Sequence, residues 1–554
     1  MNISWKSIGV YTGIIAFAVL FFLPFLGYVH LFDWDEINFA ESAREMIVTG
    51  DYITVQIDFE PFWEKPPLFF WLQVLSMKLF GINEFAARFP NFLCGIASLM
   101  VLYFLGRQIY GHRFGLFWVL TYACSILPFF YFKSGIIDPW FNLFILMGIA
   151  WFIFYLDPER HRIRIRNLVL SALFFGLAIL TKGPVAILIF ILCFLVFLAV
   201  RRFRLDTRFS HVMLFIGMVA LTGGTWFLLQ VLNGNIHILR DFIQYQIRLL
   251  STGDAGHSGF FGYHFVVVLI GVFPASVIAL KSFTKKSEQT ELQRLFRQWM
   301  YIMFWVVILL FSIVRTKIIH YSSLTYFPLT FLAAWVWEKW IDRKIEISGW
   351  QVVLLMLIAL VLSAMAVALP LIANNPQWLL ERDFITLDRF TREALNATVH
   401  WSGTEWLVGV FLFVGVSAAS IQLLRRNPSG MVILYLVSLL FVSSSIYLFT
   451  DRIEGYTQRA AIKFYEGLRG QEVYVNTLGF KSYAHLFYFD KQPGDPDFDD
   501  NVENLMQEDL DRDAYFVIKI GKKERFLEQY PQLEVLYEQN GYVFTVKRAG
   551  ITDD

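Results

Sequence analysis

Long apolar runs dominate the sequence and alternate with short polar connections. Each run has roughly 15 to 24 residues, close to the number that an α-helix needs to cross a bilayer. The runs lie at 8–30, 91–106, 114–132, 139–156, 167–181, 184–200, 211–232, 262–280, 299–314, 318–337, 350–373, 406–424 and 430–450. They predict a polytopic α-helical membrane protein with about thirteen transmembrane helices. The first run lacks a small-residue cleavage site, so we expect an uncleaved anchor.

Basic residues gather in alternate connections, and this alternation predicts the orientation of the chain. The basic connections are Arg107 to Arg113, Arg160 to Arg166, Arg201 to Arg208, Lys281 to Lys286, Lys339 to Lys344 and Arg425 to Arg426. The positive-inside rule places them in the cytoplasm, together with the N-terminus. An odd number of spans then places the loops at 31–90, 133–138, 233–261 and 374–405 at the periplasmic face, with everything after 450.

The last hundred residues have a different pattern. Segments 472–475 and 514–518 are typical of strands, and 499–511 and 522–530 are helix-like. We therefore expect two parts, a transmembrane domain at 1–450 and a small soluble α/β domain at 451–554. The second part has 20 Asp and Glu against 13 Lys and Arg. This acidic balance argues against nucleic acid or anionic lipid as its partner.

The placement of charge narrows the class of function. Charged residues make up 17% of the chain, and none lies inside the thirteen runs. Ion-coupled transporters generally need ionisable groups near mid-membrane, so we expect the chemistry at the outer interface instead. The three cysteines, Cys94, Cys124 and Cys193, lie in apolar runs without paired spacing. They indicate neither a zinc site nor a disulfide framework.

The first outer loop, 31–90, is too rich in charge for a simple connector. Apolar residues at helical spacing predict an amphipathic helix over 36–48 along the membrane surface, and a second helix is expected after Pro66-Pro67. Asp33, Asp35 and Glu36 fit a helix N-terminus, where acids are favourable and Asp33 and Glu36 have capping-box spacing. They equally fit a general base that deprotonates an acceptor at the interface.

Other charges at outer helix ends also have two interpretations. Glu64 and Lys65 form either a plain ion pair before the Pro-Pro turn or part of a phosphate clamp. Lys182, Arg315 and Lys317 either extend to the interface or join that clamp around a lipid-linked phosphate. Asp138 either favours a turn before Pro139 or faces the site.

The motifs resemble a known family. They are Trp34-Asp35-Glu36-Ile37-Asn38-Phe39-Ala40-Glu41, Ala43-Arg44-Glu45-Met46, Gly50-Asp51, Glu64-Lys65-Pro66-Pro67 and Asn83-Glu84-Phe85-Ala86-Ala87-Arg88, followed by Asp138-Pro139, Thr181-Lys182-Gly183 and Lys317 to Tyr321. The set resembles bacterial lipid A aminoarabinose transferases, which belong to the GT-C glycosyltransferases alongside protein O-mannosyltransferases. The resemblance covers the chain to about residue 345, and it is most specific in the first outer loop.

The resemblance implies the roles of the site residues. Asp35 resembles the catalytic carboxylate, with Glu36 beside it and Asp138 as a second acid. The donor phosphate is expected to contact Lys65, Arg88, Lys182, Arg315, Lys317 and Tyr321. Glu64 and His257 occupy places where the aminoarabinose enzyme can hold zinc, so we expect at most a structural zinc ion and no required cofactor.

The leading hypothesis is an inverting glycosyltransferase at the periplasmic face of the inner membrane. It would move a sugar from a polyprenyl phosphate, usually undecaprenyl phosphate, to a lipid or glycan acceptor, with no nucleic acid partner. The family's Asp-Glu-Thr-Arg run is Asp35-Glu36-Ile37-Asn38 here, so the resemblance fixes neither sugar nor acceptor. The alternatives are a protein O-glycosyltransferase, a lipid or polysaccharide transporter, and a non-catalytic scaffold.

Overall fold

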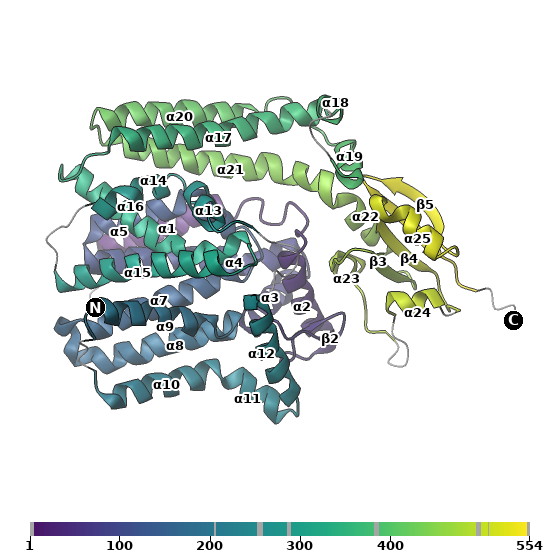
Figure 1. Cartoon of the computed structure of the whole chain (residues 1–554), viewed down its shortest axis with the longest axis horizontal. Coiled ribbons are helices and arrows are strands. Elements are labelled where there is room, and N and C mark those ends of the chain that lie inside the picture. Colours follow the sequence, from purple (N-terminus) through teal and green to yellow (C-terminus); the bar gives the residue numbers. More distant parts are fainter. Residues whose placement is uncertain are drawn as a thin grey trace.

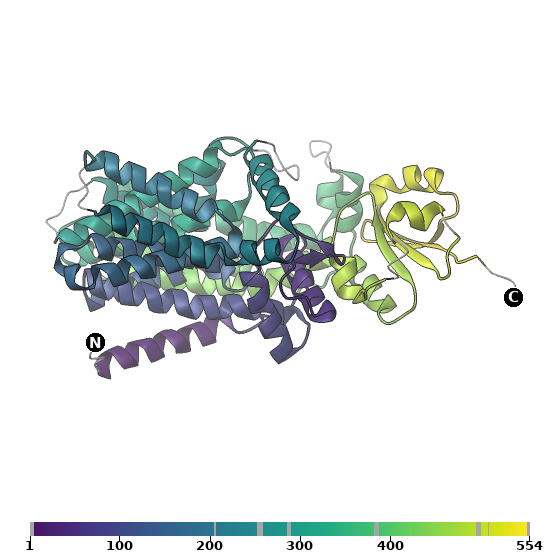
Figure 2. The same ribbon diagram turned by 90° about the horizontal axis from the view of Figure 1, so that it is seen from below.

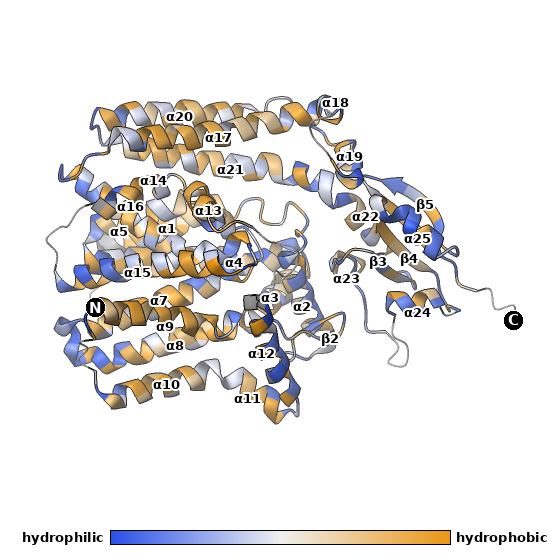
Figure 3. Ribbon diagram, viewed as in Figure 1, coloured by the Kyte–Doolittle hydropathy of each residue, from blue (hydrophilic) through white to orange (hydrophobic). Residues whose placement is uncertain are grey.

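A computed structural model of the chain describes residues 5–203, 207–251, 259–284, 290–381, 387–494, 500–507 and 509–550. Most of the helices lie side by side in a bundle, and the mixed α/β part stands at one end of it (Figure 1). The bundle, called the helical layer below, is more than one helix deep (Figure 2). Apolar residues colour the long helices of the layer, whereas polar residues gather at the α/β end and in the segments between (Figure 3).

The helices follow the apolar runs of the sequence. Those of the layer are α1 (Trp5–Phe22), α4 (Glu84–Ile109), α5 (His112–Ala123), α6 (Ile126–Tyr131), α7 (Asp138–Leu156), α8 (Arg164–Lys182), α9 (Val185–Val200), α10 (Phe209–Gly223), α11 (Thr225–Leu232), α13 (Tyr263–Gly271), α14 (Ala275–Ala279), α15 (Glu291–Ile313), α16 (Tyr326–Ile341), α17 (Gly349–Asn374), α20 (Leu407–Leu424) and α21 (Ser429–Thr457). Each predicted run contains at least one of them. Figure 2 shows α1 at the edge of the layer, next to the N-terminus.

The number of unbroken membrane-crossing helices is smaller than the sequence predicts. Within the described residues, seven helices are long and apolar enough to cross a membrane, or up to nine if each bent pair counts as one span. The two bent pairs are α10 with α11, bent by 54°, and α13 with the helix after Pro274, bent by 107°. Proline removes a backbone donor and excludes a straight helix, so the run at 262–280 is broken and not one simple span.

Short elements connect the layer. They are the 3-10 helices η1 (Pro158–Ile163), η3 (Leu280–Thr284) and η4 (Ile319–Thr325), and the helices α12 (Ile236–Ser251), α18 (Gln377–Leu380) and α19 (Arg389–Leu395). The first outer loop folds into α2 (Asp35–Thr49), a hairpin of β1 (Gln56–Ile57) and β2 (Glu60–Pro61), and α3 (Leu68–Phe80). Both helices predicted in this loop are therefore present.

The environment of α2 differs from the prediction of a helix lying along a membrane surface. All its residues from Glu36 to Met46 are buried, the charged ones included. α2 packs against α3 and against the C-terminal α/β part, with which it shares one hydrophobic core. Burial on every side is possible because Glu36, Glu41, Arg44 and Glu45 find polar partners inside the protein.

The C-terminal part is the α/β unit that the pattern predicts. It contains α22 (Arg459–Leu468), α23 (Ala484–Phe489), α24 (Val502–Gln507), η5 (Ile520–Lys522) and α25 (Lys523–Gln529) around β3 (Tyr474–Leu478), β4 (Ala514–Lys519), β5 (Glu534–Gln539) and β6 (Tyr542–Lys547). The strand order is β3-β4-β6-β5, with β3 parallel to β4 and the other pairs antiparallel. The sequence pattern missed β5 and β6. Helix α21 also runs through the boundary predicted at residue 450 without a break.

Candidate active site between the helical layer and the C-terminal domain

His320 lies between two carboxylates. Its Nε2 atom is 3.4 Å from Oδ2 of Asp35 and 3.9 Å from Oδ2 of Asp138. The other carboxylate oxygen of Asp138 accepts a 2.7 Å hydrogen bond from Nζ of Lys182. The fold thus brings together two acids, an imidazole and a cation that are widely separated in sequence. We call these four side chains the His320 cluster.

Helix ends place the members of the His320 cluster. Asp35 begins α2 and Asp138 begins α7, where the positive end of the helix dipole favours a carboxylate. Lys182 is the last residue of α8, where a cation is favoured, and Gly183 ends that helix at a φ of 92°. His320 comes from η4, directly before α16. The convergence of helix ends therefore concentrates charge without placing it in an apolar span.

Two further residues face this cluster. Tyr321 places its ring 5.4 Å from Nζ of Lys182, a cation–π contact. Burial lowers the pKa of Lys65, the opposing charge of Glu64 raises it, and the neighbouring charge of Lys182 lowers it further. Lys65 and Lys182 are thus close enough to repel one another. Two cations held together in this way favour a doubly acidic group, such as a phosphate, between them.

A cavity of about 300 Å³ opens beside Asp35 and His320. Much of its remaining lining is apolar, with Phe25, Phe130 and Ile446 among the contacting residues. A cavity that combines a few convergent polar groups with an apolar wall suits an amphipathic ligand. The chemistry that the arrangement permits is proton removal and phosphate stabilisation next to a lipid-like chain.

Asp33 also lines this cavity. Desolvation by the surrounding protein raises the pKa of the Asp33 carboxyl to about 6, although hydrogen bonds from Ser482 and the Tyr483 backbone oppose the shift. The predicted capping box of Asp33 and Glu36 is wrong, because Trp34 precedes the first helical residue and no side chain caps α2. Asp33 instead links the cavity to the C-terminal domain.

Glu36 does not face the cavity as a free acid. Arg88 forms a paired hydrogen bond with it, from Nε to Oε1 at 3.0 Å and from Nη2 to Oε2 at 2.8 Å. The backbone N–H groups of Phe32 and Gly135 donate to the same carboxylate. Burial alone would raise the pKa of Glu36, but the charge and hydrogen bonds of Arg88 outweigh it and hold that pKa below its usual range. Glu36 therefore anchors the start of α2.

Arg88 differs from the phosphate ligand that the resemblance implies. Its remaining N–H groups donate to the carbonyls of Leu26, Val29 and His30. Together with the two bonds to Glu36, these contacts use all five N–H groups of the guanidinium. Arg88 also lines the cavity, but a donor phosphate would have to displace these contacts in order to bind to it.

The ammonium of Lys317 is also occupied by groups of the protein. Its ammonium donates to the carbonyls of Phe311, Ser312 and Val314, at 3.0, 2.7 and 2.6 Å. These carbonyls belong to the end of α15, where helices leave their carbonyls without partners. Lys317 closes that helix end, whereas Arg315 is exposed two residues earlier. Of these two cations, Arg315 is the one open to a ligand.

The zinc prediction is not tested. Glu64 lies 3.8 Å from Nζ of Lys65, measured from its Oε2 atom. His257 falls in 252–258, outside the described residues. In the described ranges no group of three or more His, Cys, Asp or Glu side chains has an arrangement that could hold a metal ion.

His320 is the site residue that sequence analysis missed. The sequence places it inside an apolar run, where a lone histidine has no distinguishing pattern. The available signal was its place in the motif Lys317 to Tyr321, three residues after Lys317 at the start of that run. Asp35, Asp138 and Lys182 were predicted, and the structure brings these three together.

Comparison with known proteins supports the resemblance. Residues 64–226 match the family model described as dolichyl-phosphate-mannose-protein mannosyltransferase. The chain is 25% identical over 340 residues to the undecaprenyl phosphate-alpha-4-amino-4-deoxy-L-arabinose arabinosyl transferase of Wigglesworthia glossinidia brevipalpis, and 26% identical over 335 residues to that of Photorhabdus laumondii. Each match covers 59% of this chain, and 58% and 59% of the respective relative.

The fold comparison extends over nearly the whole chain. The crystal structure of ArnT from Cupriavidus metallidurans bound to undecaprenyl phosphate aligns with a TM-score of 0.75 at 19% identity, covering 98% of this chain and 99% of that one. Its apo state aligns with a TM-score of 0.76. The match confirms the predicted fold class, a multi-pass helical membrane protein with a small C-terminal sheet domain. In sequence and in fold, the chain resembles the aminoarabinose transferases of the GT-C glycosyltransferases, as its motifs predicted.

Proposed function

We propose that this protein is an inverting glycosyltransferase of the inner membrane. It moves a sugar from an undecaprenyl phosphate donor to a lipid or glycan acceptor at the periplasmic face, with the N-terminus in the cytoplasm. The His320 cluster carries the proposal, because it sets two carboxylates and the cation Lys182, with Lys65 nearby, beside a largely apolar cavity. The relatives whose names specify an undecaprenyl phosphate sugar support the donor.

Asp35 is assigned as the general base. Its side chain is one-third exposed and reaches the cavity, so an acceptor hydroxyl can approach it. In the transfer, the carboxylate takes the hydroxyl proton while the acceptor oxygen bonds to the anomeric carbon of the sugar. The bond from that carbon to the phosphate oxygen breaks at the same time, and its electron pair leaves with the lipid phosphate. The proton on Asp35 is then lost to water.

The cations stabilise the leaving group. Lys182 holds one hydrogen bond to Asp138 and keeps two N–H groups for a phosphate oxygen, because an ammonium has three donors. Lys65 adds a second positive charge nearby, and exposed Arg315 is a third candidate. Preorganised cations act strongly on charge that develops in a water-poor site, so the enzyme needs no nucleotide-binding fold.

The test is transfer of radiolabelled sugar from undecaprenyl phosphate-linked 4-amino-4-deoxy-arabinose in membranes. Asp35→Asn should lower turnover about a hundredfold or more, the usual contribution of a general base. Glu60→Gln is the matched control, since Glu60 is an exposed acid in the same loop and should keep wild-type turnover. Equal turnover in Asp35→Asn and wild type would contradict the assignment. Label recovered in protein would replace the lipid or glycan acceptor by a protein.

A further inference from the structure

The catalytic carboxylate follows a segment without regular secondary structure. Residues 31–32 have no helix or strand, and 33–34 form a turn directly before Asp35. Such a segment has backbone groups that a helix would otherwise satisfy internally, so something else must hold them. The N–H of Phe32 donates to Glu36, but the bonds of Leu31 and Asp33 go to the C-terminal domain, more than four hundred residues away in sequence.

Two side chains of the C-terminal domain bind this backbone. The amide of Gln458, at the junction of α21 and α22, donates from Nε2 to the carbonyl of Leu31 at 2.7 Å and accepts from the N–H of Asp33 at 3.2 Å. The hydroxyl of Tyr488, in α23, accepts from the N–H of Leu31 at 2.7 Å. Three hydrogen bonds therefore fix the two residues whose backbone leads into Asp35.

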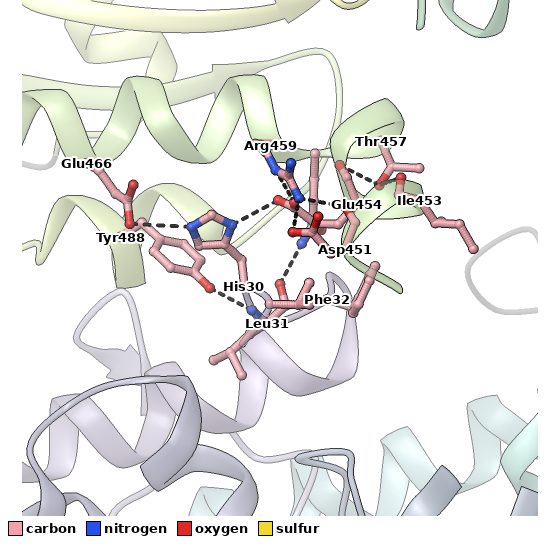
Figure 4. A network of polar contacts seen from close by, with 12 residues as sticks. His30, Leu31, Phe32, Asp451, Ile453, Glu454, Thr457, Arg459, Glu466 and Tyr488 are labelled. Atoms are coloured by element: carbon pink, nitrogen blue, oxygen red, sulfur yellow. Dashed lines mark hydrogen bonds and ion pairs between the residues drawn. The ribbon is translucent and has the colours of Figure 1, made fainter. Parts of the chain in front are cut away.

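A charged network holds Gln458 in turn. Arg459, the next residue, donates from Nη2 to Oδ1 of Asp451 at 2.6 Å and also pairs with Glu454. Glu454 is fully buried and lies 2.9 Å from Nδ1 of His30. Figure 4 shows His30 between Glu454 and Glu466, with Tyr488 reaching Leu31 below. The backbone N–H of Gln458 donates to the carbonyl of Glu454 at 3.1 Å, so this network fixes the helix junction from which the Gln458 side chain extends.

The far end of α2 is held by the same domain. Arg44 donates from Nη1 to Oδ1 of Asp490 at 3.1 Å and from Nη2 to the carbonyl of Lys491 at 2.8 Å. Lys491 also pairs with Asp58, in the turn of the hairpin that follows α2. The C-terminal domain therefore bonds near both ends of α2, so the position of α2 depends on that domain as well as on the helical layer.

We propose that the C-terminal domain positions the catalytic base, and that Gln458 and Tyr488 are the positioning residues. The inference rests on the proposed function, since it takes Asp35 as the base. Neither residue touches substrate in this proposal. Each fixes backbone that sets the distance from Asp35 to the acceptor, and a displacement of about 1 Å can cost on the order of a hundredfold in rate.

The experiment compares four variants of the full-length protein in detergent. Gln458→Met and Tyr488→Phe remove the hydrogen bonds with little change of volume. Gln532→Met and Tyr474→Phe are the matched controls, because these side chains bond to Met506 and Asp511 inside the C-terminal domain. Turnover is measured with the undecaprenyl phosphate-linked aminosugar, and amide hydrogen exchange is followed in the peptide that contains Leu31 and Asp33.

A positioning role predicts a specific combination of results. In Gln458→Met we expect kcat to fall about tenfold or more while KM for the donor stays within about twofold. The amide of Asp33 should exchange faster in Gln458→Met and that of Leu31 in Tyr488→Phe, because each variant removes the acceptor of that N–H group. Both controls should match wild type in every measurement. A domain that served only for stability would lower the thermal transition without separating kcat from KM.

The outcomes distinguish this inference from the proposed function. Wild-type kcat in Gln458→Met and Tyr488→Phe overturns the positioning role, whatever the stability of the variants. A wild-type protein that transfers no sugar overturns the proposed function instead. In that case the exchange measurement still tests whether the C-terminal domain holds this backbone. Unchanged exchange of Asp33 in Gln458→Met and of Leu31 in Tyr488→Phe contradicts that contact.

Discussion

Asp35 and Glu36 are neighbours in the first turn of α2, yet their carboxylates have opposite surroundings. The Asp35 side chain is 33% exposed and contacts His320 beside the cavity. The Glu36 side chain is 8% exposed, and four N–H groups from Arg88, Phe32 and Gly135 bond to it. Both residues line the cavity. Successive helical residues point about 100° apart, which is why one carboxylate is partly exposed there and the other is buried against Arg88.

The cations of the two regions differ in the same way. Arg88 and Lys317 have every donor occupied by carbonyls or by Glu36, whereas Lys182 has one bond to Asp138 and neighbours Lys65 across the site. The number of charges around a side chain therefore does not show whether it is open to a ligand or already bonded within the protein. The saturation of hydrogen-bonding capacity does, because a saturated group must give up contacts before it can bind a ligand.

The largest expected effect comes from breaking the saturated pair. Arg88→Met should lower the free energy of unfolding by about 3–5 kcal/mol, because Glu36 keeps a buried charge without its partner. Thermal unfolding in detergent measures the loss. Arg113→Met is the matched control, since Arg113 forms a partly exposed pair with Asp342 that is worth about 1 kcal/mol or less. A stable Arg88→Met protein with greatly reduced donor binding would return Arg88 to the phosphate site.

An intermediate effect is expected at Lys182, in the His320 cluster. Lys182→Met should lower kcat/KM by roughly ten- to a hundredfold, because a charge-assisted hydrogen bond contributes about 1.5–3 kcal/mol. The loss of stability should be smaller than in Arg88→Met. Lys78→Met controls for the substitution itself, since Lys78 is an exposed lysine of α3 that bonds to Tyr52. Wild-type transfer by Lys182→Met would assign that lysine to the placement of Asp138 alone.

The sequence predicts the fold class and names three members of the His320 cluster, Asp35, Asp138 and Lys182, for a common physical reason. Apolar runs of span length, and charges confined to their ends, are local patterns that any fold of the chain must respect. Asp138 and Lys182 were accessible to prediction because each adjoins such a run, and Asp35 because it lies in the charged first outer loop. His320 was not, because its role arises only when η4 meets α2 and α7.

The saturated contacts could not be predicted, because irregular backbone supplies the partners. Arg88 bonds to the carbonyls of Leu26, Val29 and His30, which become available only because α1 ends at Phe22. The missed strand β5 has an equally physical explanation. All six of its residues are exposed, so it shows no alternation of apolar and polar positions. The break before α14 depends on Pro274, which the length of the apolar run conceals.

The smallest expected effect concerns His30, which pairs with Glu454 and so links the segment before α2 to the C-terminal domain. Burial lowers the pKa of His30, but the hydrogen bond and charge of Glu454, with Glu466 and Glu84, more than offset this and raise the pKa above its ordinary value. His30 follows the end of α1, and the Tyr488 ring packs against it. Because the folded pKa is the higher one, the protonated imidazole stabilises the fold below the unfolded pKa of about 6.5.

That stabilisation is lost as the pH rises through the folded pKa of His30. The thermal transition of the wild type should therefore fall between mildly acidic and mildly alkaline pH, by the equivalent of about 1 kcal/mol or less, as expected for a partly exposed ion pair. His30→Asn should remove this part of the pH dependence, and His400→Asn should retain it because His400 is exposed. If the thermal transitions of His30→Asn and wild type change with pH by the same slope, the contact of His30 with Glu454 is not a stabilising ion pair between the first loop and the C-terminal domain. The attachment of Leu31 and Asp33 to the C-terminal domain would then depend on Gln458 and Tyr488 alone. The position of Asp35 should in that case not vary with pH through His30.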